Sequence, residues 1–208
     1  KRCMKKFDVI IVGSGLGGLE CATILSKEGY NVCVLEKNNL FGGALQTFTR
    51  RGYHLDTGIH YVGSLGEGQI LHQYFKYFGI MDQLKMIRLD EESFDQIYFQ
   101  GDTYHYAMGY RNFVETLARD FPREKGNLKK YTELLKEVGG LICVDRLKEG
   151  VIAKSGLFAF HQSASGVIRD ITSDKRLQNV LAATSMLYGG LKDVSTWYHH
   201  ATINNSYI

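Results

Sequence analysis

The chain has 208 residues, a length typical of one domain or slightly more, and its formal net charge of +3 is too small to indicate nucleic-acid binding. It is 44% hydrophobic and 23% charged, a composition that excludes a disordered chain. Its 23 glycines follow no repeat, which excludes a collagen-like chain. Their number exceeds average usage, which indicates that the backbone must approach another group closely.

The first predicted element is a strand over 7–12, whose β-branched residues do not alternate with polar ones. Such a run is typical of a strand buried on both faces in a parallel sheet. A glycine-rich turn follows over 13–18, then a helix through Glu28 that Gly29 ends, then a second buried strand over 31–35. A strand, a helix and a strand within about 30 residues predict a right-handed βαβ unit.

After residue 36 the pattern changes. We predict short strands over 45–50 and 53–56, a helix over 68–78, and antiparallel strands within 84–107. From residue 111 onward we predict the following helices: 112–121, 128–144, 165–171, 175–187 and 196–208. The helix predicted over 112–121 carries Phe113, Val114, Leu117 and Phe121 on one side.

These elements predict an α/β fold with a Rossmann-like start over 1–66, followed by an α+β domain over 67–208. The βαβ start is followed by about 140 residues that do not return to its sheet, and the sequence stops within a helical pattern. We therefore expect that it is a piece of a longer protein, truncated at the C-terminus.

The turn after the first strand has the spacing Gly13-x-Gly15-x-x-Gly18. In dinucleotide-binding folds the first glycine permits the tight turn, the second lets a diphosphate approach the backbone, and the third lets the helix pack closely. Unpaired N–H groups in the first turn of the helix then bind the phosphates. The predicted phosphate-binding residues are Gly13, Ser14, Gly15, Leu16, Gly17 and Gly18.

Glu36 follows the second strand, where a carboxylate can accept hydrogen bonds from both ribose hydroxyls. The same carboxylate repels a 2′-phosphate, so an NADP-type nucleotide is disfavoured. Lys37 comes next, and the pair Gly42-Gly43 offers bare backbone that suits a cofactor longer than NAD, such as FAD. An ordinary flexible turn at this pair, and NAD in place of FAD, are the alternatives.

Residues 8–19, Val34–Lys37 and Gly42-Gly43 resemble FAD-dependent oxidoreductases of the amine oxidase and phytoene desaturase superfamily. Residues 52–61, GYHLDTGIHY, resemble more specifically the carotenoid desaturase and retinol saturase branch, whose bacterial members are often described as all-trans-retinol 13,14-reductase-like. The resemblance implies an FAD-binding domain at the N-terminus, followed by a substrate or cap domain. Family members are longer, and a C-terminal portion completes the flavin site.

The resemblance also implies that Thr57, Gly58 and His60 lie at the cofactor, with His60 near the flavin ring as the candidate catalytic side chain. A loop histidine bonded to the backbone is the alternative for His60. The implied activity is hydride transfer between FAD and C–C bonds of an apolar polyene, by desaturation or saturation. Two alternatives stay open: an amine-oxidase-like enzyme that acts on C–N bonds, and a truncated nucleotide-binding fragment without catalytic activity.

The expected partners are an apolar small-molecule substrate and the missing C-terminal portion of the same protein, without nucleic acid or metal. The adjacent histidines His199 and His200 point to different helix faces, which disfavours a shared metal ion. The four cysteines are expected to be small buried hydrophobes in a reducing compartment; they are Cys3, Cys21, Cys33 and Cys143. With no signal peptide or membrane-spanning run recognised, the expected location is the cytoplasm.

An aromatic stripe on the helix predicted over 68–78 bears on both the substrate and the location. It consists of Tyr74, Phe75, Tyr77 and Phe78. Such a stripe most often belongs to a core, which is the interpretation we favour. The alternatives are that it lines a polyene channel or makes a peripheral contact with a membrane.

Overall fold

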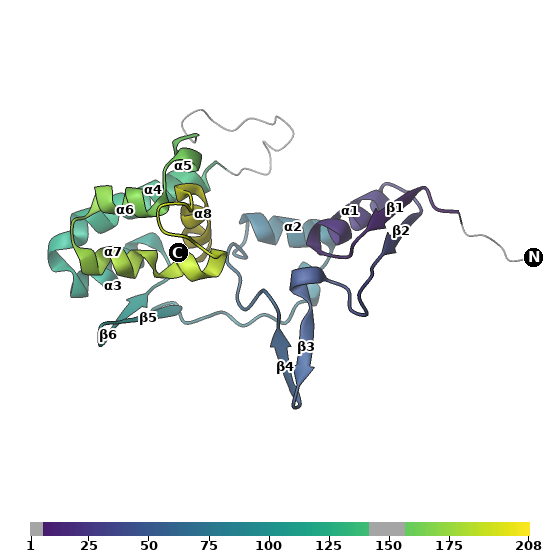
Figure 1. Ribbon diagram of the computed structural model, residues 1–208, viewed down its shortest axis with the longest axis horizontal. Coiled ribbons are helices and arrows are strands. Elements are labelled where there is room, and N and C mark those ends of the chain that lie inside the picture. Colours follow the sequence, from purple (N-terminus) through teal and green to yellow (C-terminus); the bar gives the residue numbers. More distant parts are fainter. Residues whose placement is uncertain (1–5, 142–156) are drawn as a thin grey trace, which may run out of the picture. The chain divides into compact units, whose positions relative to one another are not determined.

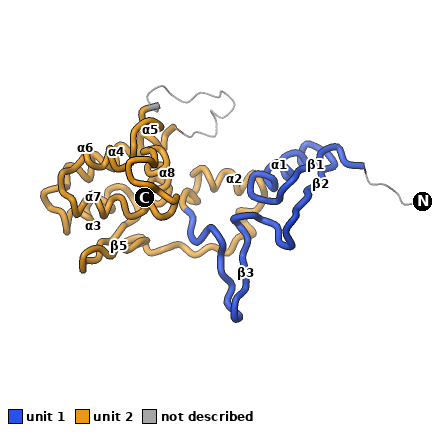
Figure 2. Tube along the Cα trace, viewed as in Figure 1, with its two compact units in different colours: residues 1–62 blue, residues 63–208 orange. Residues whose placement is uncertain are grey.

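The computed structural model describes residues 6–141 and 157–208 (Figure 1). The chain divides into two compact units, 1–62 and 63–208 (Figure 2). The boundary predicted from the sequence, after residue 66, lies a few residues further along the chain.

Unit 1 begins with the predicted βαβ unit. Strands β1 (Val9–Val12) and β2 (Val32–Leu35) pair in parallel, and helix α1 (Leu16–Lys27) connects them (Figure 1). Glu28 is the C-cap of α1, and Gly29 follows with a φ of 91°. This left-handed conformation is accessible to glycine without a steric penalty, so Gly29 ends the helix as predicted.

The prediction that these strands are buried on both faces is wrong. Along β1, partly buried residues alternate with exposed ones, and the side chains of Ile10 and Val12 are 60% and 84% exposed. Leu35, at the end of β2, is also exposed. Among the residues that the structure describes, the sheet has two strands, and its main packing partner is α1. One helix covers one face, so the other face is open.

The rest of unit 1 is a short 3-10 helix (Gly43–Leu45) and an antiparallel hairpin of β3 (Thr47–Arg50) and β4 (Tyr53–Asp56). The first of these strands starts later than predicted because Leu45 belongs to the 3-10 turn. All residues of both strands are exposed.

Unit 2 combines one hairpin with several helices (Figure 1). Its hairpin is the antiparallel pair β5 (Asp95–Phe99) and β6 (Asp102–Tyr106), the part of 84–107 that forms strands. The helices are α2 (Ile70–Phe78), α3 (Tyr110–Asp120), α4 (Lys125–Gly139), α5 (Leu157–His161), α6 (Ala164–Ile171), α7 (Lys175–Ala182) and α8 (Trp197–Tyr207). Short 3-10 helices lie at Met81–Gln83, Pro122–Glu124 and Ala183–Tyr188.

Most predicted helices of unit 2 are present, with two differences. The helix predicted over 175–187 is divided, since α7 ends at Ala182 and a 3-10 segment continues to Tyr188. The short helix α5 was not predicted. The predicted end of the helix over 128–144 falls partly outside the described residues.

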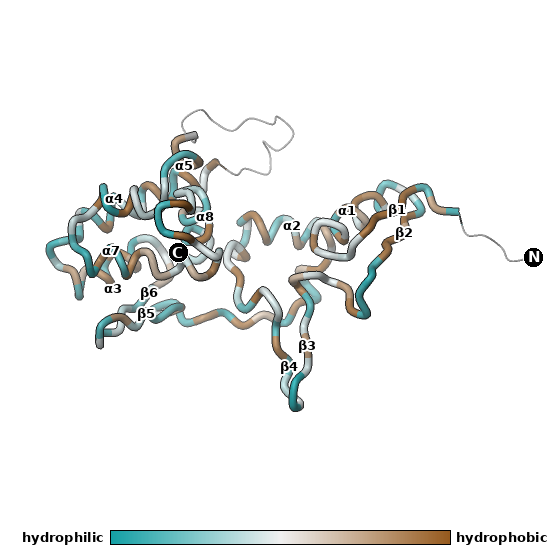
Figure 3. The backbone as a smooth tube through the Cα atoms, in the orientation of Figure 1, coloured by the Kyte–Doolittle hydropathy of each residue, from teal (hydrophilic) through white to brown (hydrophobic). Residues whose placement is uncertain are grey.

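The hydrophobic core belongs to unit 2. In the described parts of the chain, every buried apolar side chain lies between Tyr104 and Ala201. The predicted apolar side of α3 is part of this core, which also contains Tyr131 of α4 and Trp197 of α8. Figure 3 shows hydrophobic residues in β1, β2 and α2 as well, where the structure leaves them partly exposed.

The favoured interpretation of the aromatic stripe on α2 is therefore wrong. No residue of α2 is buried, and none belongs to the core cluster or packs against it. The main neighbour of α2 is the short helix Met81–Gln83, which is too small to cover an aromatic face.

No helix in the described part of the chain could cross a bilayer. Cys21 is exposed and Cys33 partly buried, so the expectation of burial fails for Cys21, while Cys3 and Cys143 lie outside the described residues.

Candidate dinucleotide-binding site

The turn between β1 and α1 has a shape that requires glycine at two positions. Gly13 has a φ of 101°, which an L-residue rarely adopts, and its N–H donates a hydrogen bond to the Leu35 carbonyl at 2.7 Å. At Gly18, an added Cβ would lie 2.2 Å from the Gly13 carbonyl oxygen. The first and third glycines of the motif therefore allow the turn and the close packing of α1 on it, as predicted from their spacing.

The middle glycine faces open space. Gly15 is the N-cap of α1 and has no side-chain cap, and a Cβ added to it would meet no atom within 4 Å. The first helical hydrogen bond runs from the Leu19 N–H to the Gly15 carbonyl at 3.0 Å. The N–H groups of Leu16, Gly17 and Gly18 precede this bond, so they have no partner within the helix. The residues present therefore fit a diphosphate at this end of α1.

The Glu36 carboxylate is held beside the turn by Ser14. Both the Ser14 N–H and the Ser14 hydroxyl donate hydrogen bonds to Glu36 Oε2, at 3.0 and 2.6 Å. The Asn38 N–H donates to Glu36 Oε1 at 2.9 Å. These bonds, the one from the Ser14 hydroxyl first, lower the pKa of Glu36 from 4.5 to about 2. The carboxylate is thus ionised and can accept hydrogen bonds from a ribose. A hydrogen bond from the Lys37 backbone lowers the pKa of Glu36 further.

The glycine pair after Glu36 packs on the turn. The Gly42 N–H donates to the Ser14 carbonyl at 2.9 Å, and Gly42 itself has a φ of 106°. A Cβ added to Gly43 would lie 3.0 Å from the Gly15 Cα. The second glycine pair is therefore an ordered turn seated against the first motif, with the two backbones in close approach.

The segment after β4 contacts the short 3-10 helix that follows the second glycine pair. The Thr57 N–H donates to the Gln46 carbonyl at 3.1 Å, and a Cβ added to Gly58 would lie 2.8 Å from the Ala44 carbonyl oxygen. Thr57 and Gly58 thus pack on the turn that carries Gly42 and Gly43. His60 is exposed and forms no hydrogen bond with any residue that the structure describes.

The structure brings most of the predicted cofactor residues into one connected group of turns, and it does not join His60 to them. Sequence reasoning assigned Ser14 to the loop but missed its bond to Glu36. The signal for this bond was the predicted parallel pairing of the two strands. In the observed register Val12 lies opposite Leu35, so residues 14 and 36 meet where the two strands end.

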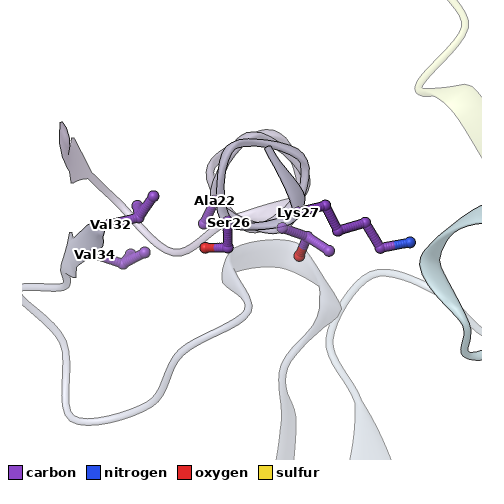
Figure 4. A pocket seen from close by; sticks show the side chains of 6 residues that line it. Ala22, Ser26, Lys27, Val32 and Val34 are labelled. Atoms are coloured by element: carbon purple, nitrogen blue, oxygen red, sulfur yellow. The ribbon is translucent and has the colours of Figure 1, made fainter. Parts of the chain in front are cut away.

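A separate hollow of about 490 Å³ lies elsewhere on unit 1 (Figure 4). It is open and is lined by Ala22, Thr23, Ser26, Lys27, Val32 and Val34. Figure 4 shows the small side chains of Ala22 and Ser26 on α1 and the two valines on β2. None of these residues belongs to the glycine-rich turns, so the hollow is distinct from the dinucleotide site.

Comparison with known proteins agrees with this geometry. Residues 11–78 match the family of NAD(P)-binding Rossmann-like domains. The chain is 32% identical to the all-trans-retinol 13,14-reductase of Macaca fascicularis over 232 residues, covering 100% of this chain and 37% of that protein. It is 31% identical to the 1-hydroxycarotenoid 3,4-desaturase of a Flavobacterium over 140 residues, covering 62% of this chain and 26% of that protein. The chain belongs to the phytoene desaturase and retinol saturase-like family of oxidoreductases.

A solved structure of a putrescine oxidase variant shares the fold, with a TM-score of 0.62 and 17% identity over 94% of this chain and 40% of that one. The α/β class and the Rossmann-like start predicted from the sequence are thereby confirmed. The chain spans little more than a third of the length of the reductase it matches.

Proposed function

We propose that this chain carries the adenine-dinucleotide half of an FAD site, in an enzyme that desaturates or saturates C–C bonds of an apolar polyene. The observation that carries the proposal is the open turn at Gly15, with the ionised carboxylate of Glu36 fixed beside it. The similarity to a retinol reductase and a carotenoid desaturase supports the polyene class.

Each part of the site has a separate task. The N–H groups at the start of α1 bind the diphosphate, because the bare backbone at Gly15 lets it approach and the helix dipole favours negative charge there. Glu36 accepts a hydrogen bond from the ribose and repels a 2′-phosphate. The turn at Gly42 and Gly43 packs against Ser14 and Gly15, so it holds the first glycine turn in place for the cofactor.

A flavin held in this way supplies the hydride acceptor or donor for the C–C bond. The role of the protein is then to bind, to orient and to exclude water. His60 stays the candidate side chain near the flavin ring. The apolar substrate, the remainder of the enzyme as partner, and a cytoplasmic location with peripheral membrane contact belong to the same proposal.

The test is whether the purified 208-residue chain binds FAD. We expect a yellow complex that absorbs at about 450 nm, together with saturable binding in calorimetry. In a Gly15→Leu variant this binding should be lost while the fold is kept, because the added Cβ meets no protein atom and the side chain occupies the approach of the diphosphate. Gly126→Leu, at an equally open glycine on α4, is the matched control and should bind FAD normally.

The results separate the alternatives. Binding of NAD in place of FAD contradicts the flavin assignment. A chain that binds neither nucleotide favours a fragment without activity. Unchanged FAD content in folded Gly15→Leu contradicts the assignment of the diphosphate to this turn.

A further inference from the structure

Ser14 occupies an unusual position in unit 1. Its side chain is only 3% exposed, and it is the one buried polar side chain among the described residues of that unit. It lies in the turn that the proposed function assigns to the diphosphate. A hydroxyl at such a position is expected to donate to the ligand, but here it is directed elsewhere.

The Ser14 hydroxyl donates its hydrogen to Glu36 Oε2 at 2.6 Å, a short, charge-assisted bond. A hydroxyl has one hydrogen, so this bond leaves none for a phosphate oxygen. The oxygen of the same hydroxyl lies 3.3 Å from the Gly42 N–H, which donates to it and also to the Ser14 carbonyl. One buried side chain thus connects the first glycine turn, the carboxylate and the second glycine turn.

Glu36 needs this support because of its place in the chain. It follows the last residue of β2, where the sheet no longer fixes the backbone, and its side chain is partly exposed. A glutamate side chain loses rotamer freedom when it binds a ligand. Two hydrogen bonds to Oε2 occupy both acceptor positions of that oxygen, and one bond to Oε1 leaves a position there for a ribose hydroxyl, so the carboxylate is fixed in advance.

We propose that Ser14 is a positioning residue for ribose recognition, which acts through Glu36 and not by contact with the phosphates. This inference rests on the proposed function and adds the group that sets its selectivity for the ribose hydroxyl. It follows that loss of the Ser14 hydroxyl weakens binding through the ribose and leaves phosphate binding in place.

The experiment compares ADP with 2′-deoxy-ADP on the 208-residue chain by calorimetry. The two probes carry the same phosphates and differ in one hydroxyl that Glu36 would accept. The unchanged chain should prefer ADP by about tenfold, the scale of a hydrogen bond to a charged group. In Ser14→Ala we expect ADP affinity to fall by about fivefold and this preference to shrink to about twofold, because the carboxylate loses its strongest tether.

A double-mutant cycle with Glu36→Gln provides the second readout. If Ser14 acts through the carboxylate, Ser14→Ala should have little effect in the Glu36→Gln background. Thr23→Ala is the matched control, since the Thr23 hydroxyl is bonded within α1 to the Leu19 carbonyl at 2.8 Å. It should leave both affinities unchanged. Far-UV circular dichroism checks folding, and if Ser14→Ala unfolds, Ser14→Cys replaces it as a weak donor of similar size.

An equal loss of affinity for both probes, or additive effects in the cycle, would show that Ser14 only packs the loop, and this overturns the inference. An unchanged chain that binds neither FAD nor ADP contradicts the proposed function itself, and with it any role for Ser14 in ribose binding. A reduced preference for ADP over 2′-deoxy-ADP in Ser14→Ala, together with non-additive effects of Ser14→Ala and Glu36→Gln, supports the inference.

Discussion

The Glu36 carboxylate accepts hydrogen bonds from Ser14 and Asn38 of its own chain, and they favour its ionised form. Because its pKa in the folded chain is lowered from 4.5 to about 2, the carboxylate stabilises the folded state at neutral pH. This contribution is lost as the pH falls from about 4.5 through about 2. Glu36 therefore stays charged at every pH at which the protein would work.

His200 is the opposite case, a base kept neutral by burial. It is fully buried in unit 2, with the hydroxyl of Tyr131 2.9 Å from Nε2 and that of Tyr188 3.1 Å from Nδ1. Burial lowers its pKa from 6.5 to about 3. The unfolded chain therefore binds a proton that the folded chain does not, at every pH between these two values.

We predict that unit 2 loses stability as the pH falls below 6.5, by about 1.4 kcal/mol per pH unit from this residue. Urea unfolding at pH 7 and at pH 5 measures the change. A His200→Gln variant should be less stable at pH 7, because the two tyrosine hydroxyls lose their partner, but it should depend less on pH. Equal pH dependence in the variant and the unchanged chain would contradict the assignment to His200.

At the scale of elements, the contact between α1 and the turn before it depends on Gly18. A Cβ there would lie 2.2 Å from the Gly13 carbonyl oxygen, and this backbone atom cannot move without disturbing the turn. Gly17, next to it in the helix, would meet no atom within 4 Å. The two neighbouring glycines provide a matched pair.

We predict that Gly18→Ala destabilises unit 1 by about 1–3 kcal/mol, the usual cost of overpacking. Gly17→Ala should be neutral or stabilising by up to about 1 kcal/mol, because alanine favours the helix. Urea unfolding followed by far-UV circular dichroism compares the two variants. Equal stability of both would show that the turn yields easily and that Gly18 is not required for packing.

The elements of unit 1 were predictable because local rules decide them. The run of β-branched residues gave β1, and the position of Gly29 gave the end of α1. The open face of the sheet was not predictable, because an apolar run shows what a strand tends to bury and not whether a neighbour is available. The bond from Ser14 to Glu36 was missed for a related reason, since it spans 22 residues and depends on the register of two strands.

In unit 2 the helical periodicity of α3 identified core residues correctly. The apolar residues of a helix lie on one face, so the sequence of the helix alone shows which side chains are buried. The change from α7 to a 3-10 segment at Ala183 could not be read from periodicity. The aromatic stripe of α2 was misassigned because its pattern is the same whether or not the chain covers it.

At the scale of the whole molecule, the two units differ in how they are stabilised. Unit 2 contains the apolar core, whereas the buried residues of unit 1, in its described part, are Ser14 and Gly42. Burial of apolar surface is the main favourable term in folding. Unit 1 should therefore unfold before unit 2.

The chain contains a single tryptophan, Trp197, which is fully buried in unit 2. Its fluorescence therefore reports on unit 2, while circular dichroism reports on both units. We predict that the dichroism of α1 is lost at a lower urea concentration than the fluorescence change. FAD or ADP should shift only the earlier transition, because a ligand stabilises the unit that binds it. Coincident transitions that shift together would show that the units fold as one.

The open sheet of unit 1 also affects the self-association of the protein in solution. In the described residues β1 and β2 pair only with each other, so each strand has an outer edge whose backbone N–H and C=O groups can pair with a strand of another molecule. The exposed side chains of Ile10 and Val12 in β1 lie beside such an edge. Samples should consequently become turbid as they are concentrated, and dilute working solutions will keep the molecules apart.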